Sequence, residues 1–184
     1  MYTSRFSDPD YGLGEASLNN IEVLVIFSHF KNEDLPDSVA KNIVQRVKKN
    51  GMGLVVLHSA HTSKPFKMLM HSSGEWKNFN EQGGVEKVKI LLPKHPIAKH
   101  IKPFLIPATE MYQEPLDVPQ PDSVIMEGSW PSFNNTSREV MTWTVGKGRV
   151  VYIRAGHETY PIYFMSSIQQ IIFNAIQWAN HKKT

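Results

Sequence analysis

The sequence of 184 residues contains no cysteine. Disulfide bonds, thiolate metal sites and a cysteine nucleophile are therefore excluded. It also lacks any apolar run approaching the roughly 18 to 20 residues that a membrane-spanning helix needs. The first residues do not show the basic-then-apolar order of a signal peptide. These absences predict a cytoplasmic protein without a membrane partner.

A strong charge of one sign is also missing. The formal net charge is only +3, and the lysines and arginines are scattered along the chain. Because no basic face with interleaved aromatic residues is visible, we expect no nucleic-acid partner. An apolar content of 41% over this length is enough for one ordinary core. We therefore expect residues 1–184 to form a single domain.

The clearest elements are present early in the chain. Residues 21–28 (IEVLVIFS) form an apolar run rich in β-branched residues, which predicts a central strand that is buried on both faces. After Pro36, apolar residues repeat at helical spacing until a basic last turn and Gly51. Residues 53–58 (GLVVLH) predict a second buried strand. Residues 21–58 are therefore expected to make a right-handed βαβ unit.

The middle of the chain is less regular. Residues 85–92 (VEKVKILL) alternate and then become apolar, which predicts a strand nearer the edge of the sheet. From 103 to 131 prolines are frequent. This density predicts a long irregular segment with one short strand at residues 123–126.

The last part of the chain predicts a hairpin and a helix. Residues 140–145 and 149–154 are two strand-like runs, and the Gly-Lys-Gly sequence between them suits a tight turn. Apolar residues then trace one face of a helix over residues 167–179. This order of elements predicts an α/β fold with a mostly parallel sheet and a late antiparallel hairpin.

Polar side chains follow three of the predicted strands. In an open α/β sheet, ligands collect outside the carboxyl ends of the strands. Histidines occur at three such ends: His29, His58 and His157, the last with Glu158 and Tyr160 close behind it. Any one of them alone could be an ordinary histidine paired with a backbone carbonyl. Together they predict a common site.

The proline-rich segment adds the sequence EMYQEP, which contains Glu110, Tyr112 and Glu114. These carboxylates either approach the same crevice or are solvated loop residues. Lys64 precedes a proline and could equally be a surface residue. Ser59 lacks the flanking glycines of a nucleophile elbow, so serine-hydrolase chemistry is not favoured.

Two chemistries suit such a set of side chains. Neutral imidazoles with a carboxylate can bind a divalent metal such as zinc, and His58, His157 and Glu114 are the expected ligands. Alternatively, histidine and glutamate act as general acid and base without a metal. The spacing of His58 and His61 is only a weak metal signal, because it is not an H-E-x-x-H motif.

Several sequence blocks resemble one known family. GMGLVVLHSAHTSKPFKMLM, HPIAKHI, EMYQEPLDVPQPD, GKGRVVYIRAGHETYP and IIFNAIQWA occur in this order over nearly the whole chain. They resemble the trehalose-utilisation, or ThuA-like, family. The resemblance implies the fold of class I glutamine amidotransferases, a flavodoxin-like three-layer α/β sandwich. It also implies a role in disaccharide or keto-sugar catabolism, beside a dehydrogenase that oxidises sugars.

The resemblance also assigns a polar signature to this chain. It falls on His29, His58, His61, Lys64, Glu110, Tyr112, Glu114, His157, Glu158 and Tyr160. In the sequence GEWKNF only Trp76 and Lys77 remain of a family pattern that commonly includes a cysteine. Without cysteine, glutamine-amide hydrolysis by the amidotransferase mechanism is excluded.

The chain departs from the family at its beginning. Members usually begin with a further strand and helix, and here the sequence starts at what resembles the second strand of the family. We therefore expect an N-terminal strand and helix to be missing. Either the chain is a truncated or differently started form, or the missing strand leaves an exposed sheet edge that a partner must cover. A partner that covers this edge would make the protein a homo-oligomer.

These observations predict an enzyme of carbohydrate metabolism whose small-molecule partner is a trehalose-like or 3-keto disaccharide. Hydrolysis, isomerisation and elimination all remain open. The expected catalytic residues are His58, His157, Glu114 and Glu158. The expected sugar-binding residues are His29, His61, Lys64, Trp76, Glu110, Tyr112 and Tyr160. The alternative is a non-catalytic sugar-binding or interaction module with the same fold.

Overall fold

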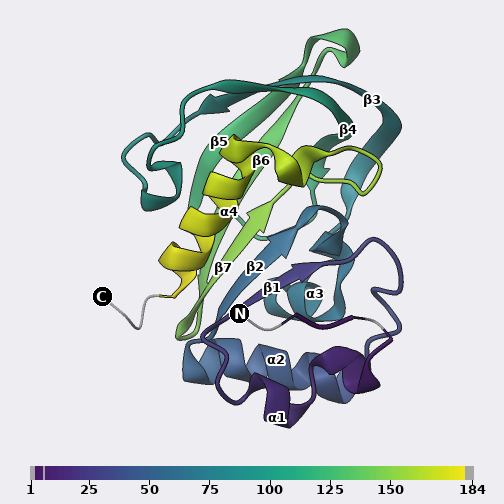
Figure 1. Ribbon diagram of the computed structural model, residues 1–184, viewed down its shortest axis with the longest axis vertical. Coiled ribbons are helices and arrows are strands. Elements are labelled where there is room, and N and C mark those ends of the chain that lie inside the picture. The colour runs from purple at the N-terminus through teal and green to yellow at the C-terminus, as the bar shows by residue number, and fades with distance from the viewer. Residues whose placement is uncertain (1–2, 6, 181–184) are drawn as a thin grey trace.

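The structure is a computed structural model that describes residues 3–5 and 7–180. One seven-stranded mixed sheet has the order β1-β2-β7-β6-β5-β3-β4 (Figure 1). The strands are β1 (Val23–Phe27), β2 (Gly53–Leu57), β3 (Trp76–Ile90), β4 (Phe104–Leu116), β5 (Ser123–Trp130), β6 (Asn135–Val145) and β7 (Gly148–Ile153). The α-helices are α1 (Glu15–Leu18), α2 (Asp37–Asn50), α3 (Lys64–Met70) and α4 (Ser166–Ala179). Short 3-10 helices are η1 (Pro9–Gly12), η2 (His58–Thr62), η3 (Pro96–Ala98), η4 (Pro131–Phe133) and η5 (Ile162–Phe164).

The predicted βαβ unit is confirmed. Strand β1 pairs in parallel with β2, and α2 connects them. Helix α2 ends at the predicted glycine: Gly51 has a φ of 72°, and its backbone N–H donates to the carbonyl of Arg46. A residue without Cβ adopts this left-handed conformation at little cost, which explains the stop.

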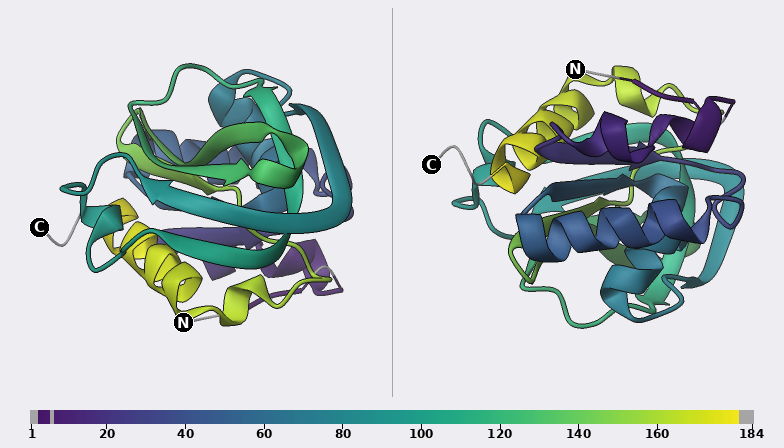
Figure 2. Two further views of the ribbon diagram at one scale, coloured as in Figure 1. Left: turned by 90° about the horizontal axis from the view of Figure 1, so that it is seen from above. Right: turned by 90° about the horizontal axis from the view of Figure 1, so that it is seen from below.

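The two faces of the sheet are covered by different helices. In β2, Leu54 and Val56 pack into a core with α2 and α3, whereas Val55 and Leu57 pack into a second core with α4. Alternate residues of a strand point to opposite faces, so α4 lies on one side of the sheet and α2 and α3 on the other (Figure 2). The predicted apolar face of the C-terminal helix is confirmed by its buried residues Ile168, Ile171, Ala175 and Ala179.

The prediction of a mostly parallel sheet is wrong. Strands β1, β2 and β7 are paired in parallel, but β7 with β6, β6 with β5, β5 with β3 and β3 with β4 are antiparallel. The prediction that residues 21–28 form a central strand is also wrong, because β1 lies at the edge and its Val25 and Phe27 are exposed. An apolar run indicates that a strand prefers burial, but it does not show which strands lie beside it.

The prediction that the proline-rich segment from 103 to 131 is irregular is wrong, because this segment contains β4 and β5. Its Pro107 and Pro115 lie in β4, the edge strand opposite β1. An edge strand tolerates proline because the backbone groups on its outer side have no neighbouring strand to pair with. Residues 85–92 do lie mainly in a strand near the edge, but β3 begins earlier, at Trp76.

The late hairpin is confirmed. Strands β6 and β7 pair from Val140 with Ile153 to Val145 with Gly148. Gly146 in the turn has a φ of 62°, as the sequence Gly-Lys-Gly predicts. The flavodoxin-like arrangement, the missing N-terminal elements and a homo-oligomer remain predictions. Among the described residues, no helix is long and apolar enough to cross a membrane.

Candidate functional site

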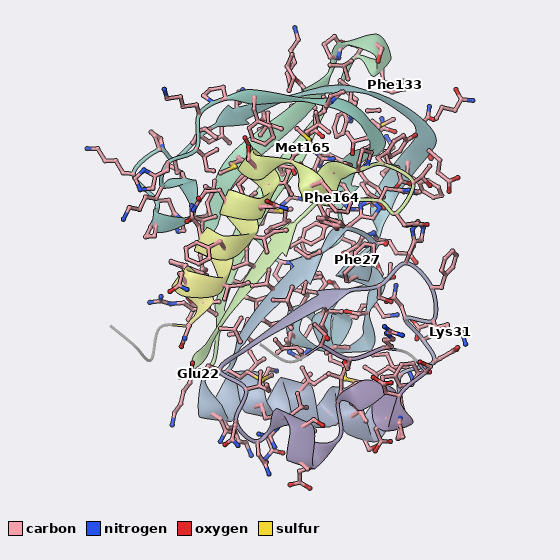
Figure 3. The ribbon with its side chains drawn as sticks, viewed as in Figure 1. Glu22, Phe27, Lys31, Phe133, Phe164 and Met165 are labelled. Carbon is pink, nitrogen blue, oxygen red and sulfur yellow. The ribbon has the colours of Figure 1, made fainter. Side chains whose placement is uncertain are left out.

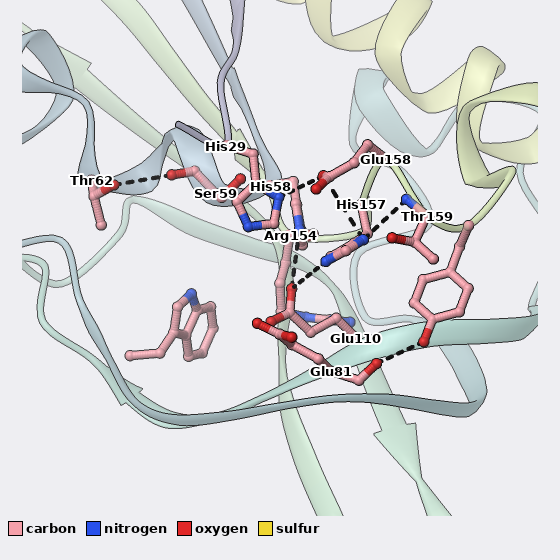
Figure 4. A network of polar contacts seen from close by, with 12 residues as sticks. His29, His58, Ser59, Thr62, Glu81, Glu110, Arg154, His157, Glu158 and Thr159 are labelled. Carbon is pink, nitrogen blue, oxygen red and sulfur yellow. Dashed lines mark hydrogen bonds and ion pairs between the residues drawn. The ribbon is translucent and has the colours of Figure 1, made fainter. Parts of the chain in front are cut away.

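Three histidines meet at the carboxyl ends of the parallel strands. His29 follows β1, His58 follows β2 and His157 follows β7. The ring centroid of His157 lies 4.9 Å from that of His29 and 5.4 Å from that of His58. The centroids of His29 and His58 are 5.8 Å apart. The structure therefore brings together the three histidines that were predicted from their positions at strand ends (Figure 4).

Two of these histidines have an unusual backbone conformation. His58 has a φ of 50° and His157 a φ of 121°. For a residue with a side chain, such values cost on the order of 1 to 3 kcal/mol and persist only where the surroundings enforce them. Gly156 leaves the space that His58 needs, since a Cβ atom there would lie 2.3 Å from the Cβ of His58. His58 is therefore packed directly against the backbone of Gly156.

Glu110 of β4 completes the centre of the site. Its carboxylate is buried, and its Oε2 lies 3.1 Å from Nε2 of His58 and 4.0 Å from Nε2 of His157. Burial raises the pKa of Glu110, but the contact with the His58 imidazole, helped by the Tyr112 hydroxyl, lowers it below its ordinary value. Glu110 is therefore ionised at neutral pH.

The backbone contacts of the two buried histidines fix different tautomers. Nδ1 of His58 lies 3.1 Å from the carbonyl of Arg154, which can only accept, so this nitrogen carries a proton. Nδ1 of His157 instead accepts the backbone N–H of Thr159 at 3.1 Å, so neutral His157 carries its proton on Nε2. Both Nε2 atoms are turned toward Glu110, whose ionised carboxylate can only accept.

Three polar atoms at the centre of the site lack a hydrogen-bond partner among the described residues. Nε2 of His58, Nε2 of His157 and Oε2 of Glu110 are buried, yet none makes a hydrogen bond of good geometry with the described residues. Buried polar atoms are normally paired, and unpaired ones demand an explanation. The three atoms face one another and are the centre of the candidate site.

A second carboxylate lies at the exposed rim of the site. Oε2 of Glu158 is 2.5 Å from Nδ1 of His29 and 3.8 Å from Nδ1 of His157. Burial raises the pKa of Glu158, but its backbone N–H and the His29 contact lower it below its ordinary value. The pair of His29 and Glu158 offers both a donor and an acceptor to an entering polar molecule.

Aromatic rings form the buried side of the site. Tyr112 lies 5.4 Å from His58 and 5.5 Å from His61, measured between ring centroids. Trp76 stacks on Tyr112 at 5.6 Å, and its Nε1–H donates to the hydroxyl of Tyr152 at 3.2 Å. Burial raises the pKa of Tyr112 far above its ordinary value, so this phenol stays neutral. Trp76 and Tyr112 thus line the site from beneath.

His61 and Tyr160 fix neighbouring segments. Nδ1–H of His61 donates to the carbonyl of Gly74 at 2.7 Å, and burial lowers the pKa of His61 to about 4. The hydroxyl of Tyr160 donates to the carbonyl of Glu81 at 2.7 Å, and its ring lies 5.5 Å from that of His157. Both side chains pack beside the site and orient it.

Two predicted residues are engaged elsewhere. Glu114 accepts from Nε and Nη2 of Arg138 at 2.8 Å each, and from the backbone N–H of Arg138 and of Leu116. Burial raises its pKa, but Arg138 lowers it below the ordinary value. Lys64 pairs with Asp37 at 2.7 Å. The contacts of Glu114 indicate a structural role, and Glu110 takes the central position for which Glu114 was predicted.

Arg154 is a residue of the site that the sequence analysis did not single out. Its carbonyl holds His58, and its side chain is fully buried against Glu86 and Glu139. A signal was present, because an arginine at the end of the buried run VVYIR needs internal partners. The sequence did not identify those partners, since they lie on β3 and β6.

The three histidines lie close enough together to be considered as ligands of one metal ion. One nitrogen from each of His29, His58 and His157 lies within 4.8 Å of the others. Nε2 of His58 suits a metal because a carbonyl holds its Nδ1–H. Nε2 of His157 does not, because the backbone N–H on Nδ1 leaves the proton on Nε2. The tautomers therefore fit acid–base chemistry better than a three-histidine zinc site.

Comparisons with known proteins agree with this fold. A family model named ThuA and described as trehalose utilisation matches residues 2–179. A solved ThuA-like protein from Parabacteroides merdae superposes with a TM-score of 0.75 at 14% identity, over 99% of this chain and 77% of that one. A ThuA-like protein from Bacteroides uniformis superposes with a TM-score of 0.69 at 18% identity, over 94% of this chain and 75% of that one. A Salmonella typhimurium protein named as cytoplasmic superposes with a TM-score of 0.62 at 16% identity, over 95% of this chain and 76% of that one. A search of curated proteins gave no match.

Proposed function

We infer the function from one premise: this chain belongs to the ThuA family of trehalose utilisation. Membership of this family indicates a carbohydrate-related role. We propose that the protein is an acid–base enzyme and that its substrate is a keto-disaccharide. The proposal rests on the family, which supplies the sugar, and on the site, which supplies the chemistry.

The observation that carries the proposal is the convergence of three buried atoms without good hydrogen bonds. They are Oε2 of Glu110, Nε2 of His58 and Nε2 of His157. A carboxylate beside two imidazoles can remove a proton from carbon while an N–H donor stabilises the charge that develops on oxygen. Glu110 is the proposed base, His157 the proposed donor, and His58 the partner that receives or returns a proton.

A ketone at C3, two carbons from the glycosidic carbon C1, makes this chemistry accessible. In a 3-keto disaccharide, the C–H at C2, next to the carbonyl, is acidic. Glu110 takes this proton, the electron pair moves to the carbonyl oxygen, and Nε2–H of His157 donates a hydrogen bond to that oxygen. In an isomerisation, the proton of the C2 hydroxyl passes to this oxygen, Glu110 returns its proton to C3, and C2 becomes the carbonyl carbon. In an elimination, the C3 carbonyl re-forms, a double bond forms between C1 and C2, and the glycosidic oxygen leaves C1 with its bonding electrons and takes the proton from Glu110.

The test compares two glutamate variants of the purified protein on 3-ketotrehalose, followed by NMR. We expect Glu110→Gln to lower turnover by about 100-fold or more, because general-base catalysis contributes roughly that amount. Glu127→Gln is the matched control, since Glu127 pairs on the surface with Lys89 at 2.6 Å. It should retain wild-type turnover.

Other outcomes would contradict parts of the proposal. Equal turnover by wild type and Glu110→Gln would remove Glu110 from the chemistry. Tight sugar binding without any product would select the alternative of a non-catalytic sugar-binding module. Stoichiometric zinc in active protein, with activity lost on chelation, would replace the metal-free mechanism with a metal-dependent one.

The proposal includes a cytoplasmic location. Support comes from two solved structures of similar fold, both from Salmonella typhimurium and both named as cytoplasmic proteins. A sugar that has been imported and oxidised inside the cell would reach the enzyme there. Fractionation of cells that produce the protein would test this location.

A further inference from the structure

Two phenyl rings at the site are largely exposed to solvent. Phe30 is 70% exposed, and its ring stacks on His29 with centroids 5.0 Å apart and planes inclined by 21°. Phe79 is 55% exposed, and its centroid lies 6.4 Å from that of Tyr112. Single exposed phenyl rings are common on protein surfaces, but these two contact rings of the candidate site.

The two phenyl rings are the ends of a continuous row of rings. From Phe30 the row passes to His29, then to His58, then to Tyr112 and finally to Phe79. The successive centroids are 5.0, 5.8, 5.4 and 6.4 Å apart. His58, in the middle of this row, is the ring in contact with Glu110. The exposed rings therefore flank the reactive centre.

Different parts of the fold provide the two ends of the row. Phe30 belongs to the loop after β1, at one edge of the sheet, whereas Phe79 lies in β3, next to the other edge. Phe79 is directly opposite Tyr112 in the β3–β4 register, so both side chains project from the same face. The chain folds back on itself to place two aromatic surfaces on either side of one centre.

We propose that Phe30 and Phe79 are the two platforms on which the two sugar rings of a disaccharide stack, one on each side of Glu110. This proposal rests on the proposed function and names the specificity determinants of the same site. Each pyranose ring has an apolar face of C–H groups that an aromatic ring can cover. A monosaccharide would fill only one platform, so the site selects a two-ring substrate.

The proposal changes the role that the sequence predicts for other aromatic residues. Trp76 and Tyr112 were expected to shape the sugar site, but both are buried and stacked on each other. A ring covered on its faces by protein cannot also stack on a ligand. The sugar-facing aromatic surface therefore belongs to Phe30 and Phe79, and Phe79 contacts the ring of Tyr112.

The chain supplies a matched control. Phe173 on α4 is 55% exposed, the same fraction as Phe79, but it lies outside the row of rings. Substitution of Phe173 removes the same apolar area from the surface without changing the site. A loss of sugar affinity shared by all three alanine variants would reflect the loss of apolar surface in general. A loss confined to Phe30→Ala and Phe79→Ala would reflect binding at the site.

The experiment measures binding of trehalose and of glucose by calorimetry to wild type, Phe30→Ala, Phe79→Ala and Phe173→Ala. We expect each site variant to weaken trehalose binding by about tenfold, because a buried aromatic face is lost. Glucose binding should fall in only one of them, and Phe173→Ala should match wild type. Phe30→Tyr and Phe79→Tyr should restore binding, because they restore the ring.

The outcomes separate this proposal from the proposed function. Turnover of 3-ketotrehalose by wild type, together with unchanged trehalose binding in Phe30→Ala and Phe79→Ala, would overturn the platforms and leave the enzyme in place. Absence of both binding and turnover in wild type would overturn the proposed function and the platforms together. Thermal unfolding of each variant confirms that the comparison concerns folded protein.

Discussion

At the residue scale, the site depends on a glycine that carries no functional group. A Cβ atom at Gly156 would lie 2.3 Å from Cβ of His58 and 2.5 Å from the hydroxyl of Tyr163. Real Cβ atoms do not approach so closely, so an alanine there must displace His58 or the loop that holds His157. Glycine at this position is a steric requirement of the reactive centre.

We therefore expect Gly156→Ala to abolish most of the turnover although it changes no acid or base. The strain of forcing in a methyl group should also lower the free energy of unfolding by about 1 to 3 kcal/mol. Turnover and urea unfolding measure the two effects. Gly14→Ala is the control, since the nearest atom to its Cβ, Oδ2 of Asp10, would be 3.5 Å away. A fully active Gly156→Ala variant would show that the ring positions tolerate displacement.

The histidines were predictable from the sequence, whereas the correct carboxylate was not. His29, His58 and His157 each follow a strand-like run, and the ends of parallel strands meet at one edge of the sheet. Glu110 and Glu114 are four residues apart in β4, and in a regular strand this spacing puts two side chains on the same face, so the local sequence pattern cannot separate them. Only the long-range pairing of Glu114 with Arg138 decides between them.

At the element scale, the main errors of prediction concern the two edge strands, β1 and β4. Prolines in residues 103–131 concealed β4, because an edge strand permits prolines that an inner strand does not. The inner elements were predictable, because their apolar patterns depend only on burial. Strand neighbours depend on pairings between distant segments, which a single sequence does not reveal.

Three strands are joined by a buried cluster of charges. Arg154 of β7 contacts both Glu86 of β3 and Glu139 of β6, and its guanidinium lies 4.2 Å from the ring centroid of Trp130. All three charged side chains are buried. Burial raises the pKa of Glu86 well above its ordinary value, although Arg154 acts against this effect. Burial therefore favours the protonated form of Glu86, while Arg154 favours the ionised form.

These opposing effects predict unequal costs for two substitutions. Arg154→Met removes the cation that contacts both buried carboxyl groups, so the free energy of unfolding should fall by about 3 to 5 kcal/mol. Glu86→Gln replaces the protonated acid that burial favours with a neutral amide of the same shape and should cost about 1 kcal/mol or less. Urea unfolding at neutral pH gives both values. Equal costs would mean that Glu86 is ionised in the folded protein.

At the scale of the whole molecule, the site joins the two halves of the sheet. The parallel strands β1, β2 and β7 supply the histidines, and the antiparallel half supplies Glu110 through β4. His61 ties the halves together, because it follows β2 and its Nδ1–H donates to the carbonyl of Gly74, just before β3. Stability of the fold and geometry of the site are therefore linked through a titratable residue.

His61 makes the stability of the fold dependent on pH. Burial lowers the pKa of His61 from 6.5 to about 4, so the unfolded chain binds the proton more readily than the folded protein does. The stabilisation is complete above pH 6.5 and is lost as the pH falls toward 4. A shift of this size corresponds to a loss on the order of 3 kcal/mol.

A variant without this titration isolates the effect of His61. In His61→Gln, the side-chain amide can still donate to the carbonyl of Gly74, but it does not take up a proton between pH 7 and pH 4. Urea unfolding of wild type and His61→Gln at several values in this range should show a steeper decline for wild type. Because every other titrating group is shared, the difference in slope belongs to position 61. Parallel declines would mean that His61 titrates alike in the folded and unfolded chain, and that its ring is not sealed between the two halves of the sheet.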